Sequence, residues 1–348
     1  MANTHNYDPL LEFMDRPAFL VTDGIIRQVN QAARQRMIAT NEPISKYLDR
    51  DLPAYEEFHG GCLYLSLSVE QILCGASVIA LDDSHLFLLD AQADSQLKAL
   101  SLAAQQLRLP MNNVYIAAEA IDDRKMADHI AQSLSQMHRI ICNMADAARY
   151  YERMSFCGET TDLNQFISET VEKATALVHT AGVQLTYTAL PQNVVGTADR
   201  QMLERAILNL ISNAVKFSPK HSTVDIKLTR KGHMLYFTVH DAGEGIDPDI
   251  QRTIFTRYLR EPGIEDGRHG LGLGLSVVRS AATNHGGTVL IDHPESGGTR
   301  VTMTLDLRSR EDHLLRSPIS IPTVDYAGGH DHALLELSDV LPPSAYKE

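Results

Sequence analysis

The sequence predicts an α+β protein of several domains, and three observations lead to that prediction. Residues 235–240 alternate apolar and polar side chains, as a half-buried strand does, and lead into a glycine-containing turn at 241–245. Residues 270–274 form a glycine-rich stretch ahead of a predicted helix. Between 97 and 151, apolar residues recur at steps of three and four, the spacing of paired helices. With 348 residues, 44% of them hydrophobic, the chain is long enough for roughly two or three separately cored domains.

Residues 1–92 are predicted to form a small α/β domain. The stretch 17–30 fits a strand, an Asp-Gly turn and a second strand, followed by a helix rich in Ala, Arg and Gln. Two further strands are expected within 69–89. No residue set there marks a haem, flavin or metal site. The cysteines of the chain lack zinc spacing and are expected to be small core residues: Cys62, Cys74, Cys142 and Cys157.

Two antiparallel helices are predicted in the region 93–156. The first carries its apolar stripe on Leu97, Leu100, Ala104, Leu107, Met111, Val114, Ala118 and Ile121. The second repeats the spacing on Ile130, Leu134, Met137, Ile141, Met144, Ala148 and Tyr151. Two helices alone bury such stripes less well than they do against a second copy, so we expect a homodimer built on a four-helix bundle.

Residues 201–217 are predicted to form a helix that carries two amides on one face. Asn209 and Asn213 are four residues apart, so both side chains point the same way. Amide oxygens suit a magnesium ion bound mainly through nucleotide phosphates, and Asn213 is the candidate ligand. Lys216 lies three residues further on and can direct its ammonium group toward a polyphosphate.

The predicted strand at 235–240 ends at Asp241, followed by Gly243 and Gly245. A carboxylate at a strand end can accept from an exocyclic amine such as adenine N6, and the glycines let the backbone approach a flat base. The isolated pattern also fits an ordinary tight turn.

Gly270, Gly272 and Gly274 lead into a helix predicted to start at Ser276, so backbone N–H groups of this loop can cradle phosphates. Its spacing is neither the dinucleotide-binding nor the P-loop pattern. Each motif is weak evidence by itself, so the functional assignment rests on the order of four stretches: 209–214, 241–246, 254–258 and 270–275.

In that order the stretches resemble the ATP-binding domain shared by histidine kinases, type II topoisomerases, heat-shock 90 chaperones and mismatch-repair ATPases, and most of all the histidine kinases. The resemblance makes 209–217 the N box of that family, 241–245 its first glycine box, 255–258 its F box and 270–275 its second glycine box. The resemblance implies the Bergerat ATP-binding fold for residues 157–308, with ATP and Mg²⁺ as ligands. It implies ATP-binding roles for Asn209, Asn213, Lys216, Asp241, Gly243, Gly245, Phe255, Tyr258, Gly270, Gly272, Gly274 and Leu275. Asn213 would hold Mg²⁺, and Asp241 would contact adenine. The segment between Tyr258 and Gly270 matches the ATP lid of the family. In and beside this lid segment three arginines could approach the terminal phosphate, and the sequence does not choose among Arg257, Arg260 and Arg268.

The same resemblance makes the hairpin a dimerisation and phosphoacceptor module, with Leu107, Arg108 and Pro110 at the positions of the H box. That box normally begins with a phosphoacceptor histidine and an acidic residue, and this chain has Gln105 and Gln106 there. A carboxamide nitrogen is not nucleophilic and has no accessible pKa near neutrality, so conventional autophosphorylation is chemically excluded.

Other acceptors on the hairpin are conceivable. His129 and His138 are expected on an exposed face of the second helix, where neutral imidazole is a competent nucleophile but where surface histidines are also common. Ser101 is a further candidate. No histidine lies between His85 and His129, so a shifted alignment would not supply one.

The flanking regions and the composition complete the expectations. Residues 1–92 resemble a PAS-type sensor domain, and residues 309–348, with several prolines, are expected to be a loosely attached tail in which 333–341 forms one or two helical turns. A formal net charge of −13 disfavours nucleic-acid or anionic-membrane binding. No apolar run could span a bilayer and no leader is visible, so a cytoplasmic protein is expected.

Three functions remain open. The first is a dimeric ATP-binding pseudokinase that recruits or blocks a response regulator or a partner kinase. The second is an active kinase that transfers the γ-phosphoryl group to an unconventional acceptor or in trans. The third, a mechanical ATPase, is disfavoured because position 209 lacks the acidic residue that such ATPases use to activate water.

Overall fold

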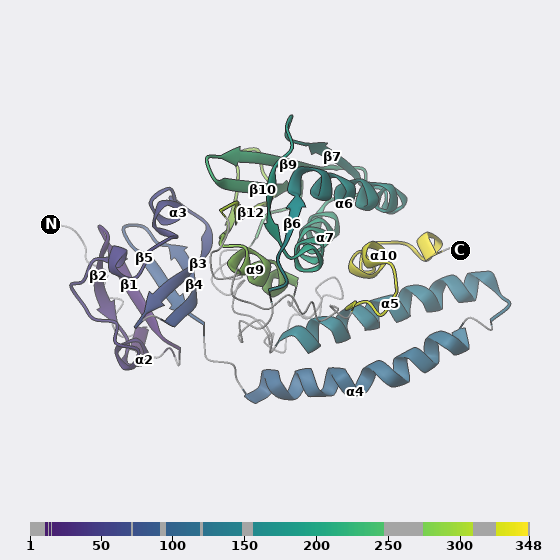
Figure 1. Cartoon of the computed structure of the whole chain (residues 1–348), viewed down its shortest axis with the longest axis horizontal. Helices are drawn as coiled ribbons and strands as arrows, with labels where there is room; N and C mark the ends of the chain where they lie inside the picture. Colours follow the sequence, from purple (N-terminus) through teal and green to yellow (C-terminus); the bar gives the residue numbers. More distant parts are fainter. Residues whose placement is uncertain are drawn as a thin grey trace.

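The architecture consists of an N-terminal sheet, a larger sheet covered by helices, and two long helices beside it (Figure 1). A computed structural model describes residues 11–12, 14, 16–70, 72–90, 95–118, 121–147, 156–246, 274–308 and 325–346. The arrangement confirms the predicted α+β class. None of the helices in these ranges is long and apolar enough to cross a membrane.

The N-terminal region forms an antiparallel sheet with short helices between its second and third strands. Its elements are β1 (Ala18–Thr22), β2 (Ile25–Val29), α2 (Gln31–Gln35), the 3-10 helix η1 (Ile44–Lys46), α3 (Leu52–Glu56), β3 (Cys62–Val69), β4 (Ile72–Ala80) and β5 (His85–Leu89). The strands lie in the order β2-β1-β5-β4-β3. Asp23 and Gly24 between β1 and β2 have φ of 51° and 71°, as a tight hairpin turn requires. The predicted strand, turn, strand and helix are confirmed, whereas the sequence did not predict β3.

The region from 156 to 308 is a sheet with helices packed on one face. Its elements are β6 (Glu159–Asp162), α6 (Leu163–Val178), η2 (His179–Ala181), β7 (Gln184–Thr188), β8 (Val195–Ala198), α7 (Arg200–Phe217), β9 (Thr223–Lys231), β10 (Met234–His240), α9 (Gly274–Asn284), β11 (Val289–Asp292) and β12 (Arg300–Asp306). The main strands lie in the order β11-β12-β10-β9-β7, and β6 pairs with β8 separately. Leu235, Phe237 and Val239 of β10 are buried against the helices, and the residues between them are partly exposed, as predicted.

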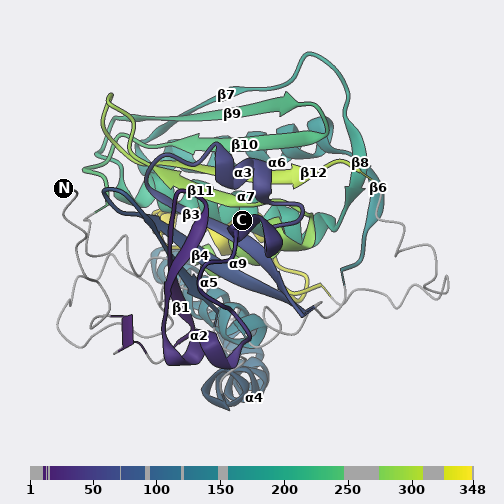
Figure 2. The same cartoon turned by 90° about the vertical axis from the view of Figure 1, so that its left-hand side faces the viewer.

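The two sheets are continuous, which the sequence did not predict. β3 of the N-terminal sheet pairs antiparallel with β11, with Val289 opposite Tyr64 and Ile291 opposite Cys62. The resulting ten-stranded sheet runs from β2 to β7, and Figure 2 shows its successive strands side by side. The edge of one sheet therefore satisfies the backbone groups of the other.

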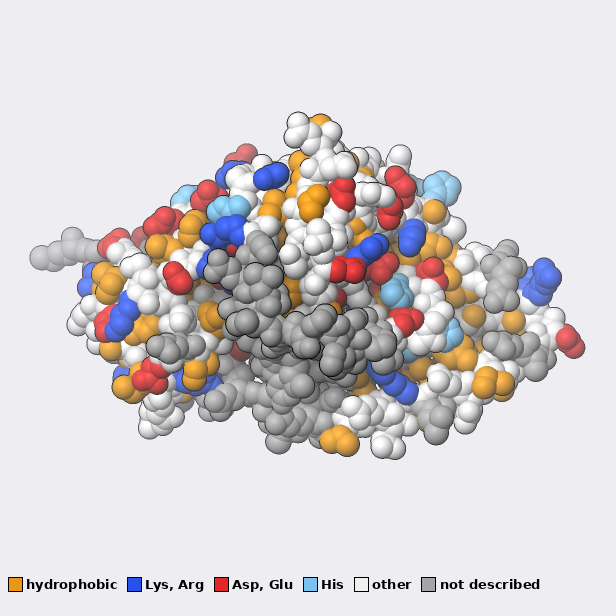
Figure 3. Space-filling model, in the orientation of Figure 1, with side chains coloured by type: hydrophobic (Ala, Val, Ile, Leu, Met, Phe, Trp, Pro, Cys, Tyr) orange, Lys and Arg blue, Asp and Glu red, His pale blue; other side chains and the backbone are white. Residues whose placement is uncertain are grey.

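The predicted hairpin is present as α4 (Ser95–Ala118) and α5 (Arg124–Ala147). The second helix begins earlier than its apolar stripe, because Asp123 accepts hydrogen bonds from the backbone N–H groups at the helix start. Within the hairpin, Ala104 and Met111 are buried against Leu134 and Ile141. A second row of apolar residues on the two helices is 41–48% exposed: Leu107, Val114, Met137 and Ile140. In Figure 3 hydrophobic side chains are visible on the surface of this part of the molecule.

The expectation of a loose C-terminal tail is wrong for residues 325–346. This segment contains α10 (His332–Glu336) and the 3-10 helix η4 (Pro343–Tyr346), and it lies between α7 and α5 (Figure 1). Its apolar side chains are at most 4% exposed at Ala333, Leu335, Leu337 and Leu341. Because apolar residues lie on two sides of the short helix, the segment is buried against both neighbours rather than solvated.

The cysteine prediction holds in part. Cys62 and Cys142 are buried core residues, Cys74 is partly exposed, and Cys157 is exposed. The expectation is therefore wrong for Cys157, which lies on the connection leading into β6 rather than inside an element.

Candidate functional site

Helix α7 carries the two amides that were predicted to share a face. Asp199 begins the helix by accepting a hydrogen bond of 3.0 Å from the backbone N–H of Met202. Asn209 is fully buried and Asn213 is partly exposed. A Cβ atom added to Gly274, the first residue of α9, would lie 2.8 Å from Asn209 Oδ1 and 3.9 Å from Asn213 Nδ2. Only glycine allows this approach, so the N-box helix and the end of the glycine-rich loop meet.

The first glycine box lies against the C-terminal end of the same helix. Asp241 is 7% exposed, and its Oδ1 accepts hydrogen bonds from the N–H groups of Gly243 at 2.9 Å and Thr299 at 3.0 Å. A Cβ atom on Gly243 would lie 2.7 Å from the carbonyl oxygen of Phe217, the last residue of α7. Gly245 has a φ of 87°, which favours glycine. The turn is therefore a fixed part of the α7 surface, with a carboxylate held in one orientation.

Some of the predicted site lies outside the described residues. These are Phe255, Tyr258, Gly270 and Gly272, together with Arg257, Arg260 and Arg268 of the lid segment. Leu275 is described on the first turn of α9, where it packs partly buried against the main core. The contacts of the F box and of the loop with a ligand stay predictions.

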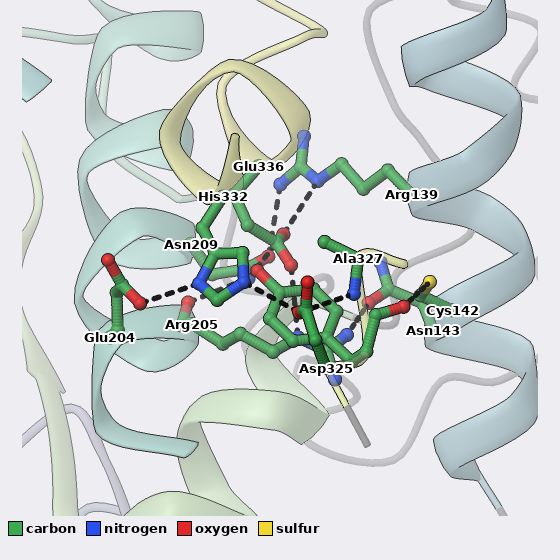
Figure 4. A network of polar contacts seen from close by, with 11 residues as sticks. Arg139, Cys142, Asn143, Glu204, Arg205, Asn209, Asp325, Ala327, His332 and Glu336 are labelled. Atoms are coloured by element: carbon green, nitrogen blue, oxygen red, sulfur yellow. Dashed lines mark hydrogen bonds and ion pairs between the residues drawn. The ribbon is translucent and has the colours of Figure 1, made fainter. Parts of the chain in front are cut away.

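The amide of Asn209 is fully engaged by residues that the sequence did not single out. Its Oδ1 accepts a hydrogen bond of 3.0 Å from Arg139 on α5. Its Nδ2 donates to the carbonyl oxygen of Arg205 at 2.8 Å and to the carboxylate of Glu336 on α10 at 2.9 Å. Figure 4 shows these side chains converging from three helices. Asn209 therefore sits at a junction of the hairpin, α7 and the C-terminal segment.

Ion pairs surround this junction. Glu336 is 0% exposed and pairs with Arg139 at 3.2 Å and with Arg205 at 3.0 Å. Asp339 pairs with Arg139 at 2.9 Å and with Lys216, a predicted polyphosphate contact, at 3.6 Å. A sequence signal for Glu336 existed, since it is an acidic residue inside the short apolar run 333–341. No sequence rule linked it to two arginines so far away in the chain.

The comparison with protein families decides the identity of this region. Residues 198–309 match the family described as histidine kinase-, DNA gyrase B- and HSP90-like ATPases. These residues form an ATPase domain of that family. The match covers α7, the first glycine box, α9 and the closing strand β12, so it includes every described stretch on which the resemblance rests.

Similar curated proteins include a sensor protein and two histidine kinases. KdpD of Clostridium acetobutylicum, a sensor protein, is 29% identical over 208 residues, which cover 56% of this chain and 23% of KdpD. The sensor-like histidine kinase SenX3 of Mycobacterium tuberculosis is 27% identical, with 58% and 52% of the two chains covered. The histidine protein kinase DivJ of Caulobacter vibrioides is 29% identical, with 65% and 40% covered. The chain thus matches about half or less of the length of these relatives.

Among solved structures, full-length ShkA in complex with AMPPNP aligns with a TM-score of 0.49 at 21% identity. The alignment covers 61% of this chain and 47% of ShkA.

The hairpin residues beside the ATPase domain differ in exposure. Gln105 and Gln106 are exposed on α4, and His129 is exposed on α5, as expected. His138 is 4% exposed, so the expectation of a surface histidine is wrong there. Its ring lies 5.3 Å from that of His330 and 6.1 Å from that of Tyr115. Burial, with His330 and Arg108 nearby, lowers the pKa of His138 to about 4, so its imidazole is neutral at pH 7.

A second histidine, His332, links the C-terminal segment to the ATPase domain through an ion pair with Glu204 of α7. His332 Nδ1 lies 2.7 Å from the carboxylate of Glu204 on α7, and its Nε2 lies 2.8 Å from that of Asp325. The hydrogen bond with Glu204 is the main reason that the pKa of His332 is raised to about 9, with that of Asp325 adding to it. At neutral pH the ring is therefore protonated and lies between two carboxylates.

Proposed function

We propose that the protein is a dimeric, ATP-binding member of histidine-kinase signalling that lacks the usual phosphoacceptor and acts as a pseudokinase. The observation that carries the proposal is the pair of exposed glutamines, Gln105 and Gln106, on α4, beside an ATPase domain whose Asn213, Asp241 and Gly274 are arranged around α7. The arrangement of these residues supports a nucleotide site, whereas the two glutamines cannot supply the acceptor chemistry of the H box.

ATP and Mg²⁺ fit the described residues. The partly exposed Asn213 is the amide available to hold Mg²⁺, which would neutralise charge on the phosphates. Asp241, fixed by Gly243 and Thr299, would accept from the adenine amine. The close approach of Gly274 to α7 leaves backbone N–H groups at the start of α9 to meet phosphate oxygens.

Exposure on the hairpin supports the homodimer. One row of each apolar stripe is buried within a single chain, whereas the row that contains Leu107 and Val114 is left 46–48% exposed on α4. A second hairpin packed against this row would complete a four-helix bundle through residues 93–156.

The N-terminal region fits the role of a PAS-like sensor domain at 1–92. Its strand order β2-β1-β5-β4-β3, with helices between β2 and β3, is compatible with that type of sheet. It immediately precedes α4 in the sequence, so we expect a change in it to affect the dimer. A response regulator or a true kinase, bound in the cytoplasm, is the partner that such a dimer would recruit or block.

An active kinase remains the second candidate because His129 is exposed on α5 and an imidazole can accept a phosphoryl group. The missing histidine can also be supplied in trans by a partner.

The test is incubation of the purified full chain with Mg²⁺ and γ-labelled ATP, with ATP binding measured by calorimetry on the same sample. A pseudokinase binds ATP without taking up label. We expect Asn213→Ala and Asp241→Ala to weaken binding by about tenfold or more, because each removes a contact to a charged or polar ligand group. The exposed Asn193→Ala is the control. Acid-labile label on His129 would replace the pseudokinase with the active kinase, and absence of ATP binding would refute both.

A further inference from the structure

The segment 325–346 makes contact on two sides. Toward the ATPase domain, Ala333, Leu337 and Leu341 join the main hydrophobic core that includes α7. Toward the hairpin, Tyr326, Ala327 and Leu335 form a separate small cluster with Cys142 of α5. A short helix with apolar residues on both sides thus joins two elements that are separate in the chain.

Hydrogen bonds and one ring-stacking contact bind the segment to the two helices of the hairpin. On α5, Gln132 Nε2 donates to the carbonyl oxygen of Leu341 at 2.7 Å, and Gln136 Nε2 donates to that of Ser338 at 3.1 Å. On α4, the ring of Tyr115 stacks on that of His330 with centroids 4.4 Å apart. The side-chain amides satisfy carbonyl groups at the end of the segment, so its docked position is specific rather than a general collapse.

Buried ion pairs hold the segment against α7 and α5. The buried carboxylate of Glu336 is shared by Arg139 and Arg205, whose side chains are 7% and 6% exposed. Removal of one partner from a buried ion pair is costly because the remaining charges stay desolvated. Two guanidinium groups would remain here, so docking depends strongly on this one carboxylate.

The acidic residues of the segment engage residues that are also assigned to the nucleotide. Glu336 holds Asn209, and Asp339 pairs with Lys216. A polyphosphate is the other anion that these residues are suited to meet, where Gly274 at the start of α9 approaches Asn209 and Asn213 of α7. The carboxylates of the segment and a polyphosphate cannot both accept hydrogen bonds from Asn209 and Lys216 without weakening each other's binding.

We propose that residues 325–346 form an acidic latch that closes on α5 and α7, and that the polyphosphate of a bound nucleotide competes with the latch for Asn209 and Lys216. The latch joins the ATPase domain to the hairpin and covers His138 and Cys142 when closed. Nucleotide binding would open it and release the hairpin. The competition rests on the proposed ATP site, whereas the latch itself does not.

Native cysteines provide the measurement. Cys142 is 0% exposed, and its Sγ donates a hydrogen bond to the carbonyl oxygen of Tyr326 at 3.3 Å, so it becomes accessible when the latch opens. Cys62 is 1% exposed in β3, where burial raises the pKa of its thiol to about 12, and it reports global unfolding. The full chain is treated with a thiol reagent, and labelling of each cysteine is followed by peptide mass analysis.

We expect Glu336→Gln to increase the labelling rate of Cys142 by about tenfold or more, since opening is governed by the local free energy of the segment. Labelling of Cys62 should not change. Asp331→Asn is the matched control: Asp331 is exposed on the same segment and caps α10 by accepting from Leu334 N–H at 2.8 Å, and asparagine caps equally well. An unchanged rate at Cys142 in Glu336→Gln, or equal acceleration in Asp331→Asn, would overturn the latch.

If Glu336→Gln accelerates both cysteines, the variant has unfolded globally. Hydrogen exchange of the wild-type protein then decides, since a latch requires residues 325–346 to exchange before β3.

The second arm adds Mg-ATP to the wild-type chain, with binding verified by calorimetry on the same sample. Faster labelling of Cys142 at saturating ATP supports the competition. Bound ATP with unchanged Cys142 labelling would overturn it. Absence of ATP binding would refute the proposed function and the competition that rests on it, and the variants would still decide whether the latch exists.

Discussion

The side-chain amide of Asn209 donates a hydrogen bond of 2.9 Å to the carboxylate of Glu336, 127 residues further along the chain. The first residue belongs to the N box of the ATPase domain, and the second to a segment after its closing strand. The same amide accepts from Arg139 on the hairpin. A single side chain thus contacts three parts of the molecule, and changes near it are expected to affect both stability and nucleotide binding.

Gly274→Ala should destabilise the ATPase domain and weaken ATP binding. The added methyl group would lie 2.8 Å from Asn209 Oδ1, so α9 or the amide must move. Overpacking of this kind costs about 1–3 kcal/mol in the free energy of unfolding, measured with urea. Gly60→Ala is the matched control, because no atom lies within 4 Å of its added methyl group. Equal stability of the two variants would show that the contact is not tight in solution.

Arg279→Met should destabilise the junction between the N-terminal region and the ATPase domain. The guanidinium of Arg279 on α9 pairs with Asp90 and lies 3.9 Å from the ring centroid of Tyr64 on β3. Removal of one partner of a buried pair costs about 3–5 kcal/mol in unfolding free energy. The pair Lys231–Glu57 joins the same two regions but is 66–70% exposed, so Lys231→Met should cost less than about 1 kcal/mol. If Arg279→Met changed the free energy of unfolding as little as Lys231→Met does, the buried pair would not stabilise the junction.

Leu107→Asp should convert the proposed dimer to a monomer. Leu107 is 46% exposed in the single chain, on the row that a second hairpin would cover, and a carboxylate buried there would remain unpaired. Sedimentation velocity measures the change in mass. Leu102→Asp is the control, since Leu102 is 62% exposed on another face of α4. A dimer that withstands Leu107→Asp would place the interface elsewhere.

His332 should make the attachment of the C-terminal segment sensitive to high pH. The folded protein raises the pKa of His332 from its ordinary 6.5 to about 9, so its stabilising effect is fully present below pH 6.5 and is lost as the pH rises through 9. His332→Gln should therefore lower the free energy of unfolding by about 1–2 kcal/mol at pH 6, after allowance for partial exposure of the ring.

The difference between wild type and His332→Gln should shrink by pH 10, in urea titrations of both proteins at each pH. A difference that stays constant from pH 6 to pH 10 would rule out the ion pairs of His332 with Glu204 and Asp325 as its cause.

Local patterns predicted three elements of the ATPase domain, namely α7, β10 and α9. Leu235, Phe237 and Val239 form the buried face of β10, because successive side chains of a strand point to opposite faces and only one face of this strand is buried. Asn209 and Asn213 were predicted to share one face of α7, because residues four apart lie on the same side of a helix. The prediction of His138 as a surface residue failed, since the sequence did not show that His330 would cover it.

The sequence by itself determined helix α7, strand β10 and the two helices of the hairpin, the amides and carboxylate of the candidate nucleotide site, and the absence of a histidine at position 105, because each depends on side-chain chemistry and short periodicities. Only the tertiary structure decided that β3 continues the ATPase sheet and that Glu336 reaches Asn209 between Arg139 and Arg205. These contacts join residues far apart in the chain, and which distant charges and strand edges meet is set by how the domains pack together.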